Sequence, residues 1–187
     1  YVIDQYSAPN NAPFYNAEAL AWSDAIAPGI IDLSLLPEIS WTTDIAGGVT
    51  KKAALETGLA EGTPVICGTI DAAAEAVSVG AIAPGDMMLM YGSTIFIIAL
   101  TDKPVRDARL WYAPWMFAGQ HASMAGLSTS GTLTHWLHDT MGRELEAGDA
   151  MRLMAAEAEA SPPGANGVIM LPYFSGERTP IHDPHAK

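Results

Sequence analysis

Asp71 is the residue of this chain whose type and position best suit acid–base chemistry. It follows an apolar, strand-like run over 64–70 and opens an alanine-rich run over 71–80 that is typical of a helix. The passage from a strand into a helix is where α/β domains usually place their active sites. A carboxylate there can accept a proton, although capping of the helix N-terminus is the commonest task for Asp at such a position. The residues alone leave both interpretations open.

The turn at Gly92 and Ser93 suits the binding of a phosphate. It separates two apolar runs, 87–90 and 95–100, and its residues are small. Glycine lets a ligand approach the backbone closely, and a hydroxyl donates to an oxyanion. An ordinary hairpin turn would use the same residues without any ligand. Together with Asp71, the turn favours phosphoryl transfer, which needs an oriented nucleophile and stabilised negative charge.

The elements expected around these residues alternate between strands and helices. Thr50 is placed to cap a short helix over 51–56 that ends at Gly58 and leads into the strand before Asp71. Ser130 is placed to cap a helix over 131–141, whose apolar residues recur at helical spacing. Further expected elements are a helix around 16–26, strands over 87–90, 95–100, 111–117 and 168–173, and a helix over about 144–160. This mixture is that of an α/β domain.

Composition argues against several classes of function. The chain has 187 residues, 49% of them hydrophobic, and can bury the core of one domain or two small ones. Its formal net charge of -12, with only 9 Lys and Arg, argues against a nucleic-acid groove. The sequence has no apolar run long enough to span a membrane and no signal peptide. Its single cysteine, Cys67, excludes an internal disulfide. We therefore expect a cytoplasmic protein without nucleic-acid or membrane partners.

Other catalytic motifs are missing from the sequence. There is no Gly-x-x-x-x-Gly-Lys-Ser/Thr loop, no Gly-x-Gly-x-x-Gly and no Gly-x-Ser-x-Gly. Two pairs of histidines, His135 with His138 and His182 with His185, have a spacing that can share a helix face, but they lack cysteine partners for a zinc site. We therefore assign no metal-ligating side chain.

Several short motifs follow one another along the chain. They are Gly68-Thr69-Ile70-Asp71, the turn 91–94, the segment 171–180 with Asp183-Pro184 after it, and upstream Trp22-Ser23, 36–39, 47–50 and 57–65. In their order and spacing they resemble the FGGY family of carbohydrate kinases, most closely its xylulokinase-like members. Each motif is weak alone, whereas the ordered set is specific and runs through nearly the whole chain.

The resemblance implies a role for each candidate site residue. In the family, the Asp of a Gly-x-x-Asp motif takes the proton from the sugar hydroxyl that attacks the γ-phosphate of ATP, and Asp71 matches it. Gly92 and Ser93 match a phosphate-binding turn, although the family's usual order is Gly-Thr-Ser or Gly-Thr-Gly and this chain has Gly-Ser-Thr. Gly131 and His135 match a helix-start glycine and a polar residue four positions later that line the nucleotide site. His135 stands where glycerol kinases have Gln.

The resemblance also implies the fold and the domains. The family has the actin-like ATPase fold, an α/β fold related to ribonuclease H. We expect residues 1–64 to be the C-terminal part of the first, sugar-binding domain and residues 65–187 the N-terminal part of the second, nucleotide-binding domain. The family's first phosphate loop, Asp-x-Gly-Thr-Thr/Ser, and its adenosine-binding glycine stretch are missing from this sequence. The chain is therefore expected to be an internal piece of a kinase, inactive alone.

The implied activity is transfer of the γ-phosphate of ATP, with Mg²⁺ bridging the phosphates, to a hydroxyl of a ketopentose. D-Xylulose, converted to xylulose 5-phosphate, is the first candidate. Glycerol, ribulose or another sugar or polyol is an alternative, and a non-catalytic kinase-like module used for binding or assembly is another. Arg178 is expected to join an ion pair that pins its loop, and a homodimer is expected by analogy with related kinases.

Overall fold

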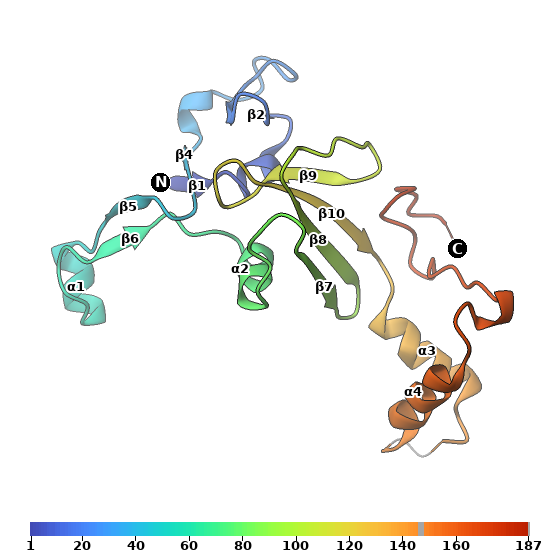
Figure 1. Cartoon of the computed structure of the whole chain (residues 1–187). Helices are drawn as coiled ribbons and strands as arrows, with labels where there is room; N and C mark the ends of the chain where they lie inside the picture. The colour runs from blue at the N-terminus through green and yellow to red at the C-terminus, as the bar shows by residue number, and fades with distance from the viewer. Residues whose placement is uncertain (146–147, 187) are drawn as a thin grey trace. The chain divides into compact units, whose positions relative to one another are not determined.

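The chain forms two compact units, and each is described by itself. The computed structural model describes residues 1–145 and 148–186. The first unit comprises residues 1–88 and 98–124, and the second comprises residues 89–97 and 125–187. Both units combine helices and strands (Figure 1), as the α/β prediction requires.

The helices and strands from the N-terminus to Asp71, the candidate general base, are mostly short. In chain order they are β1 (Val2–Asp4), the 3-10 helix η1 (Ala8–Asn11), β2 (Tyr15–Asn16), β3 (Ala21–Trp22), η2 (Leu33–Leu35), β4 (Glu38–Ser40), β5 (Ile45–Gly48), α1 (Lys51–Thr57), β6 (Pro64–Ile66) and α2 (Asp71–Ser78). The elements that follow are β7 (Met87–Tyr91), β8 (Ile95–Thr101), β9 (Trp111–Pro114), β10 (His121–Leu127), α3 (Gly131–Met141), α4 (Ala150–Ala160) and η3 (Ala165–Gly167).

The short helix predicted after Thr50 is confirmed as α1, with both of its caps. The Thr50 Oγ1 accepts a hydrogen bond from the amide of Ala53 at 3.2 Å. Gly58 ends the helix in the left-handed region, with a φ of 79°. Threonine supplies the acceptor and glycine tolerates the positive φ, so local chemistry determines both ends of this helix.

The helix predicted around 16–26 is wrong, because this stretch folds as the hairpin of β2 and β3. Tyr15 lies opposite Trp22, and their rings meet edge to face with centroids 6.1 Å apart. The Asn16 Oδ1 accepts hydrogen bonds from two backbone amides that follow it, which is the local bonding by which Asn favours turns. Leu20 has a φ of 53°, outside the helical region. Turn chemistry therefore outweighs the helical spacing of the apolar residues.

The core of the first unit is centred on Trp115, which is fully buried. The Tyr6 ring packs edge-on against Trp115 with centroids 5.1 Å apart, and its hydroxyl donates to the Met124 Sδ at 3.1 Å. Ile98 of β8 is also fully buried. These contacts explain why residues 98–124 belong to the same unit as the N-terminal residues.

Four strands form one sheet in the order β7, β8, β10, β9 (Figure 1). The hairpin of β7 and β8 confirms the two predicted apolar strands. The predicted strand over 111–117 is confirmed only as the shorter β9, because the chain turns back after it, with the Trp115 amide donating to the Gln120 carbonyl at 2.9 Å. β10 pairs antiparallel with β9, Ala122 lying opposite Ala113. The sequence did not predict β10, since its small residues carry little β-propensity.

The helices of the second unit follow the prediction in part. The helix predicted over 131–141 is confirmed as α3. The helix predicted over about 144–160 is confirmed from Ala150 as α4, and residues 146 and 147 of that prediction lie outside the described residues. Among residues 1–145 and 148–186, no helix combines the length and the apolar character needed to cross a membrane.

The strand predicted over 168–173 is wrong. In the part of the chain that the structure describes, no strand pairs with these residues, and Val168 and Ile169 are 73% and 85% exposed. An apolar run is typical of a strand, but its backbone becomes a strand only when a neighbour supplies hydrogen bonds.

His121, the first residue of β10, should titrate below the ordinary range of histidine. Burial, and then the positive charge of Arg106, lowers the pKa of His121 from its ordinary 6.5. Its Nδ1 lies 2.8 Å from the Tyr112 hydroxyl, and the two rings stack. The pKa of His121 is therefore lower in the folded state than in the unfolded state. The stability that a neutral His121 permits is fully present above about pH 6.5, and the free energy of unfolding decreases as the pH falls from there to the folded-state pKa. An NMR titration of the His121 ring should show this lowered pKa, and a value above 6.5 would contradict the burial argument.

Candidate active site

Asp71 is the first residue of α2, and its side chain is exposed. The N-cap position belongs to Ile70, whose apolar side chain cannot accept a hydrogen bond. The Asp71 Oδ1 instead accepts from the amide of Ala72 at 2.8 Å. The capping interpretation of Asp71 is therefore wrong. The carboxylate lies in the first helical turn, where the helix dipole favours negative charge, and it is accessible to a substrate hydroxyl.

The turn between β7 and β8 is hydrogen-bonded to the first residues of α3 within the second unit. The Gly92 carbonyl accepts from the Gly131 amide at 2.9 Å and from the Ser130 hydroxyl at 2.7 Å. The Ser93 carbonyl accepts from the Ser130 amide at 3.0 Å and from the Thr132 hydroxyl at 3.3 Å. Three residues predicted to lie at the nucleotide site, Gly92, Ser93 and Gly131, are thus brought together.

Ser130 occupies the N-cap position of α3 without capping the helix. Its hydroxyl donates to Gly92, so the predicted side-chain cap is wrong. The sequence could not show that the turn at Gly92 would compete for this hydroxyl. The N-terminus of α3 is left without a side-chain cap, and the partial positive charge of such a terminus attracts anions.

Glycine is needed at position 131 because the turn lies directly against it. A Cβ on residue 131 would lie 2.6 Å from the Gly92 carbonyl oxygen. At Gly92, by contrast, a Cβ would come no closer than 3.7 Å to the Thr94 carbonyl oxygen, an ordinary contact. The Gly92 amide already donates to that oxygen at 3.0 Å. Packing within the chain therefore explains why residue 131 is glycine. Because the Gly92 amide is already used, the amide and hydroxyl of Ser93 are the groups of the turn best suited to bind a phosphate.

His135 is exposed on α3, one turn after Gly131. Residues four apart on a helix lie on the same side, so both predicted nucleotide-site residues of α3 share one side. The neighbouring Thr134 ties the helix to β7, because its Oγ1 lies 3.0 Å from the Tyr91 hydroxyl. Sequence analysis missed this pair, and the separation of 43 residues gives no local signal for it.

The loop over 175–184 is organised by Glu177, a residue that sequence analysis did not single out. Glu177 is 4% exposed, and its Oε2 accepts from the amides of Ile181 at 2.7 Å and His182 at 3.1 Å. The loop thus closes on a buried carboxylate and presents Arg178 at the surface. The ion pair of Arg178 stays a prediction.

Comparison with known proteins identifies the family. Residues 87–187 match the FGGY family of carbohydrate kinases, C-terminal domain. The chain belongs to the FGGY family of carbohydrate kinases. The membership predicted from the motifs is confirmed.

Relatives of the FGGY chain include kinases for different sugars. It is 26% identical over 195 residues to the gluconokinase of Bacillus subtilis (strain 168), covering 100% of this chain and 38% of that kinase. It is 27% identical to the xylulose kinase of Lactococcus lactis subsp. lactis (strain IL1403), covering 97% of this chain and 36% of that kinase. The structure of the xylulose kinase from Rhodospirillum rubrum matches with a TM-score of 0.85 at 31% identity, covering 97% of this chain and 37% of that one.

The FGGY chain therefore spans little more than a third of the length of these kinases. Because FGGY kinases have the actin-like ATPase fold, the match to the Rhodospirillum rubrum structure confirms the predicted fold class. The predicted domain boundary near residue 64 stays a prediction.

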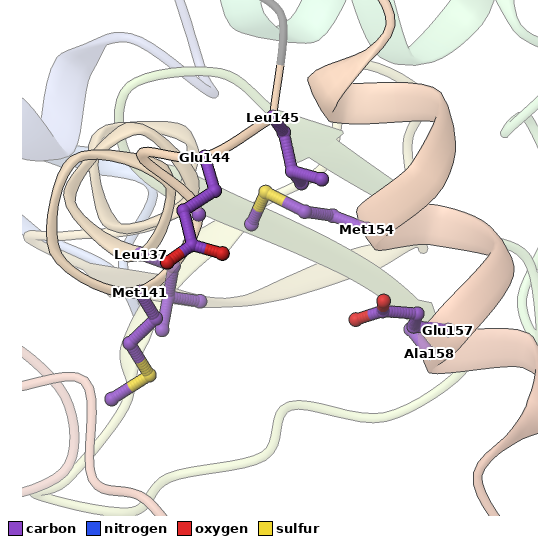
Figure 2. Close-up of a pocket in the computed structure, with 8 residues that line it drawn as sticks. Leu137, Met141, Glu144, Leu145, Met154, Glu157 and Ala158 are labelled. Carbon is purple, nitrogen blue, oxygen red and sulfur yellow. The ribbon is translucent and has the colours of Figure 1, made fainter.

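A cavity of about 440 Å³ lies between α3 and α4 of the FGGY chain (Figure 2). The residues that line it are Leu137, Met141, Gly142, Glu144, Leu145, Met154, Glu157 and Ala158. None of the predicted site residues is among them, so we assign this cavity no part in the reaction.

Proposed function

We propose that the complete protein transfers the γ-phosphate of ATP to a hydroxyl group of a sugar. The observation that carries the proposal is the exposed carboxylate of Asp71 at the first position of α2, in a chain of the FGGY family. We ascribe the activity to the complete polypeptide that contains these residues, because the chain spans only 36% to 38% of its relatives.

Asp71 is the general base of the proposed reaction. Its carboxylate takes the proton of the sugar hydroxyl, whose oxygen attacks the γ-phosphorus of ATP. A new O–P bond forms, the bond from the γ-phosphorus to the β,γ-bridging oxygen breaks, and ADP leaves with that electron pair. The proton passes from Asp71 to water after the products leave. Proton transfer by a positioned side chain contributes about 10²–10⁴-fold to a rate.

The turn at Gly92 and Ser93, with the start of α3, binds the phosphates of the nucleotide in this proposal. Hydrogen bonds from α3 occupy the carbonyls of both turn residues and hold the turn in place. The Ser93 amide and hydroxyl and the α3 N-terminus then face the phosphate charge, and Gly131 with His135 flanks the nucleotide.

Mg²⁺ would neutralise part of the phosphate charge when bound. Within 1–145 and 148–186, no three His, Cys, Asp or Glu side chains gather into a group that could hold a metal ion. In kinases Mg²⁺ commonly binds through phosphate oxygens, water and one or two carboxylates, so it would not need a group of three such side chains.

D-Xylulose is the sugar that we propose first, with xylulose 5-phosphate as the product. The proposal is supported by the 31% identity to the Rhodospirillum rubrum xylulose kinase and the 27% identity to that of Lactococcus lactis. The segment Ser175-Gly176-Glu177-Arg178-Thr179-Pro180, which resembles xylulokinase-like sequences, points the same way.

Gluconate is the second candidate, because the Bacillus subtilis gluconokinase aligns with the whole chain at 26% identity. Gluconate carries a carboxylate that xylulose lacks, and carboxylates are bound best by Arg or Lys. A preference for gluconate would therefore depend on a cationic contact that xylulose does not need.

Sugar-dependent release of ADP by the complete kinase tests the proposal. D-Xylulose, D-ribulose, D-gluconate and glycerol are compared at equal concentration with Mg²⁺ and ATP. We expect kcat/KM to be about tenfold or more higher for D-xylulose than for the others, because a polar site discriminates strongly against a substrate that leaves its groups unpaired. A highest value for gluconate would favour the second candidate. If no sugar stimulates ADP release, the kinase proposal fails and a non-catalytic binding module takes its place.

A further inference from the structure

Asp4 is a buried carboxylate far in sequence from Asp71. It ends β1 and is 2% exposed. Its Oδ1 accepts a hydrogen bond from the Ser7 amide at 3.1 Å, and its Oδ2 accepts one from the Thr42 hydroxyl at 2.8 Å. A buried carboxylate is strongly destabilising unless its oxygens are hydrogen-bonded. The contact with Thr42 is therefore one that the folded state must keep.

Thr42 links Asp4 to the loop that precedes Asp71. It is 8% exposed, and its carbonyl accepts from the Gly68 amide at 3.0 Å. Gly68 has a φ of 76°, a backbone angle that favours glycine, and the chain turns there before it enters α2. A chain of hydrogen bonds thus runs from the Asp4 carboxylate through Thr42 to the short loop over 67–70 that ends at Asp71.

Charge effects on neighbouring side chains agree with this arrangement. Burial raises the pKa of Tyr6 well above its ordinary value, and the negative charges of Asp4 and then of Asp71 raise it further. Burial also raises the pKa of Cys67, at the start of the loop, and the charge of Asp4 adds to the effect. Asp4 is thus close enough to act on the beginning of the loop, and both carboxylates act on the same tyrosine.

We propose that Asp4 is a positioning residue, which holds the 67–70 loop through Thr42 so that Asp71 is placed to accept the proton of the sugar. The inference rests on the proposed function of Asp71. Asp4 touches no substrate in this scheme and acts only on the backbone before α2. Placement matters because a shift of about 1 Å at a reacting group lowers a rate by about 10²-fold.

Asp4→Asn in the complete kinase tests the inference. Asparagine keeps the volume but removes the negative charge and one of the two acceptor oxygens, so the hydrogen bond from the Thr42 hydroxyl to the carboxylate is lost or reversed in direction. We expect kcat to fall about 10–100-fold, while the KM for ATP changes by less than about twofold because the nucleotide contacts are unaltered.

Two variants of Thr42 and one of Asp24 complete the experiment. Thr42→Val removes the hydroxyl and should lower kcat as Asp4→Asn does, whereas Thr42→Ser keeps the hydroxyl and should recover most of the rate. Asp24→Asn makes the same chemical change at an exposed acid of the same unit, and kcat should stay within about twofold. If Asp4→Asn does not accumulate as folded protein, the Thr42 pair carries the test.

A double variant separates positioning from a general loss of stability. In the Asp71→Asn background there is no base left to position, so adding Asp4→Asn should lower kcat by less than about twofold more. If adding Asp4→Asn to Asp71→Asn lowers kcat by as much as it does in the wild type, the inference about Asp4 is wrong. Wild-type kcat in both Asp4→Asn and Thr42→Val would also overturn it. Neither result would affect the proposed function of Asp71. Full turnover in Asp71→Asn would overturn the proposed function of Asp71, and the inference with it.

Discussion

In the complete kinase, Asp71→Asn should lower kcat for sugar phosphorylation by about 10²–10⁴-fold, the contribution of one general base. Asparagine cannot take the proton, but its Oδ1 can still accept the hydrogen bond that Asp71 receives from Ala72 at 2.8 Å. The side chain is exposed, so the substitution disturbs no packing. The loss should therefore fall on kcat and leave the KM for ATP little changed. Release of ADP at saturating sugar and ATP measures it.

Glu75→Gln is the matched control for this experiment. Glu75 is exposed, lies one turn beyond Asp71 on α2 and undergoes the same change from acid to amide. Its kcat should stay within about twofold of wild type, as for most surface substitutions. If kcat falls equally in Asp71→Asn and Glu75→Gln, the loss comes from the reduced negative charge of the helix, and Asp71 does not act as a base. Wild-type kcat in Asp71→Asn would assign the base to another residue.

Gly131→Ala should raise the KM for ATP by about tenfold or more. The added Cβ would lie 2.6 Å from the oxygen and 3.3 Å from the carbon of the Gly92 carbonyl. Both atoms are backbone, so no flexible side chain can yield, and the turn and α3 must move apart. Overpacking of this kind costs about 1–3 kcal/mol, and about 1.4 kcal/mol corresponds to a tenfold change in binding.

Gly148→Ala provides the comparison for Gly131→Ala. At Gly148 an added Cβ meets nothing within 4 Å, and the backbone lies outside the left-handed region. The KM for ATP should therefore be that of the wild type. Calorimetric titration with a non-hydrolysable ATP analogue, together with thermal melting, separates weaker binding from a loss of folded protein. Unchanged nucleotide affinity in a folded Gly131→Ala variant would show that the turn does not bind the phosphates.

The sequence predicts those elements whose ends are decided by local chemistry. Thr50 and Gly58 cap α1 as expected, because a hydroxyl acceptor and a residue tolerant of positive φ act within one helical turn. The stretch over 16–26 has helical spacing, but the bonding of Asn16 to its own following amides makes a turn. The run over 168–173 is apolar, yet pairing depends on a distant neighbour that periodicity does not describe.

Residue types at the candidate site can be predicted from the sequence, but the contacts among them cannot. A Gly-x-x-Asp motif and a Gly-Ser turn are visible as patterns. The hydrogen bond from Ser130 to Gly92 joins residues 38 apart, and so does the one from Thr42 to Asp4. No local spacing specifies either contact, because each depends on how complete elements pack. The buried carboxylate of Asp4 has no distinguishing pattern for the same reason.

Residues 168–171 matter for anyone who wishes to produce this polypeptide. Their four apolar side chains, Val168, Ile169, Met170 and Leu171, are 73%, 85%, 49% and 59% exposed. An extended apolar segment that pairs with no strand within the described ranges is a template for association between copies. Expressed by itself, the 187-residue chain should therefore aggregate readily.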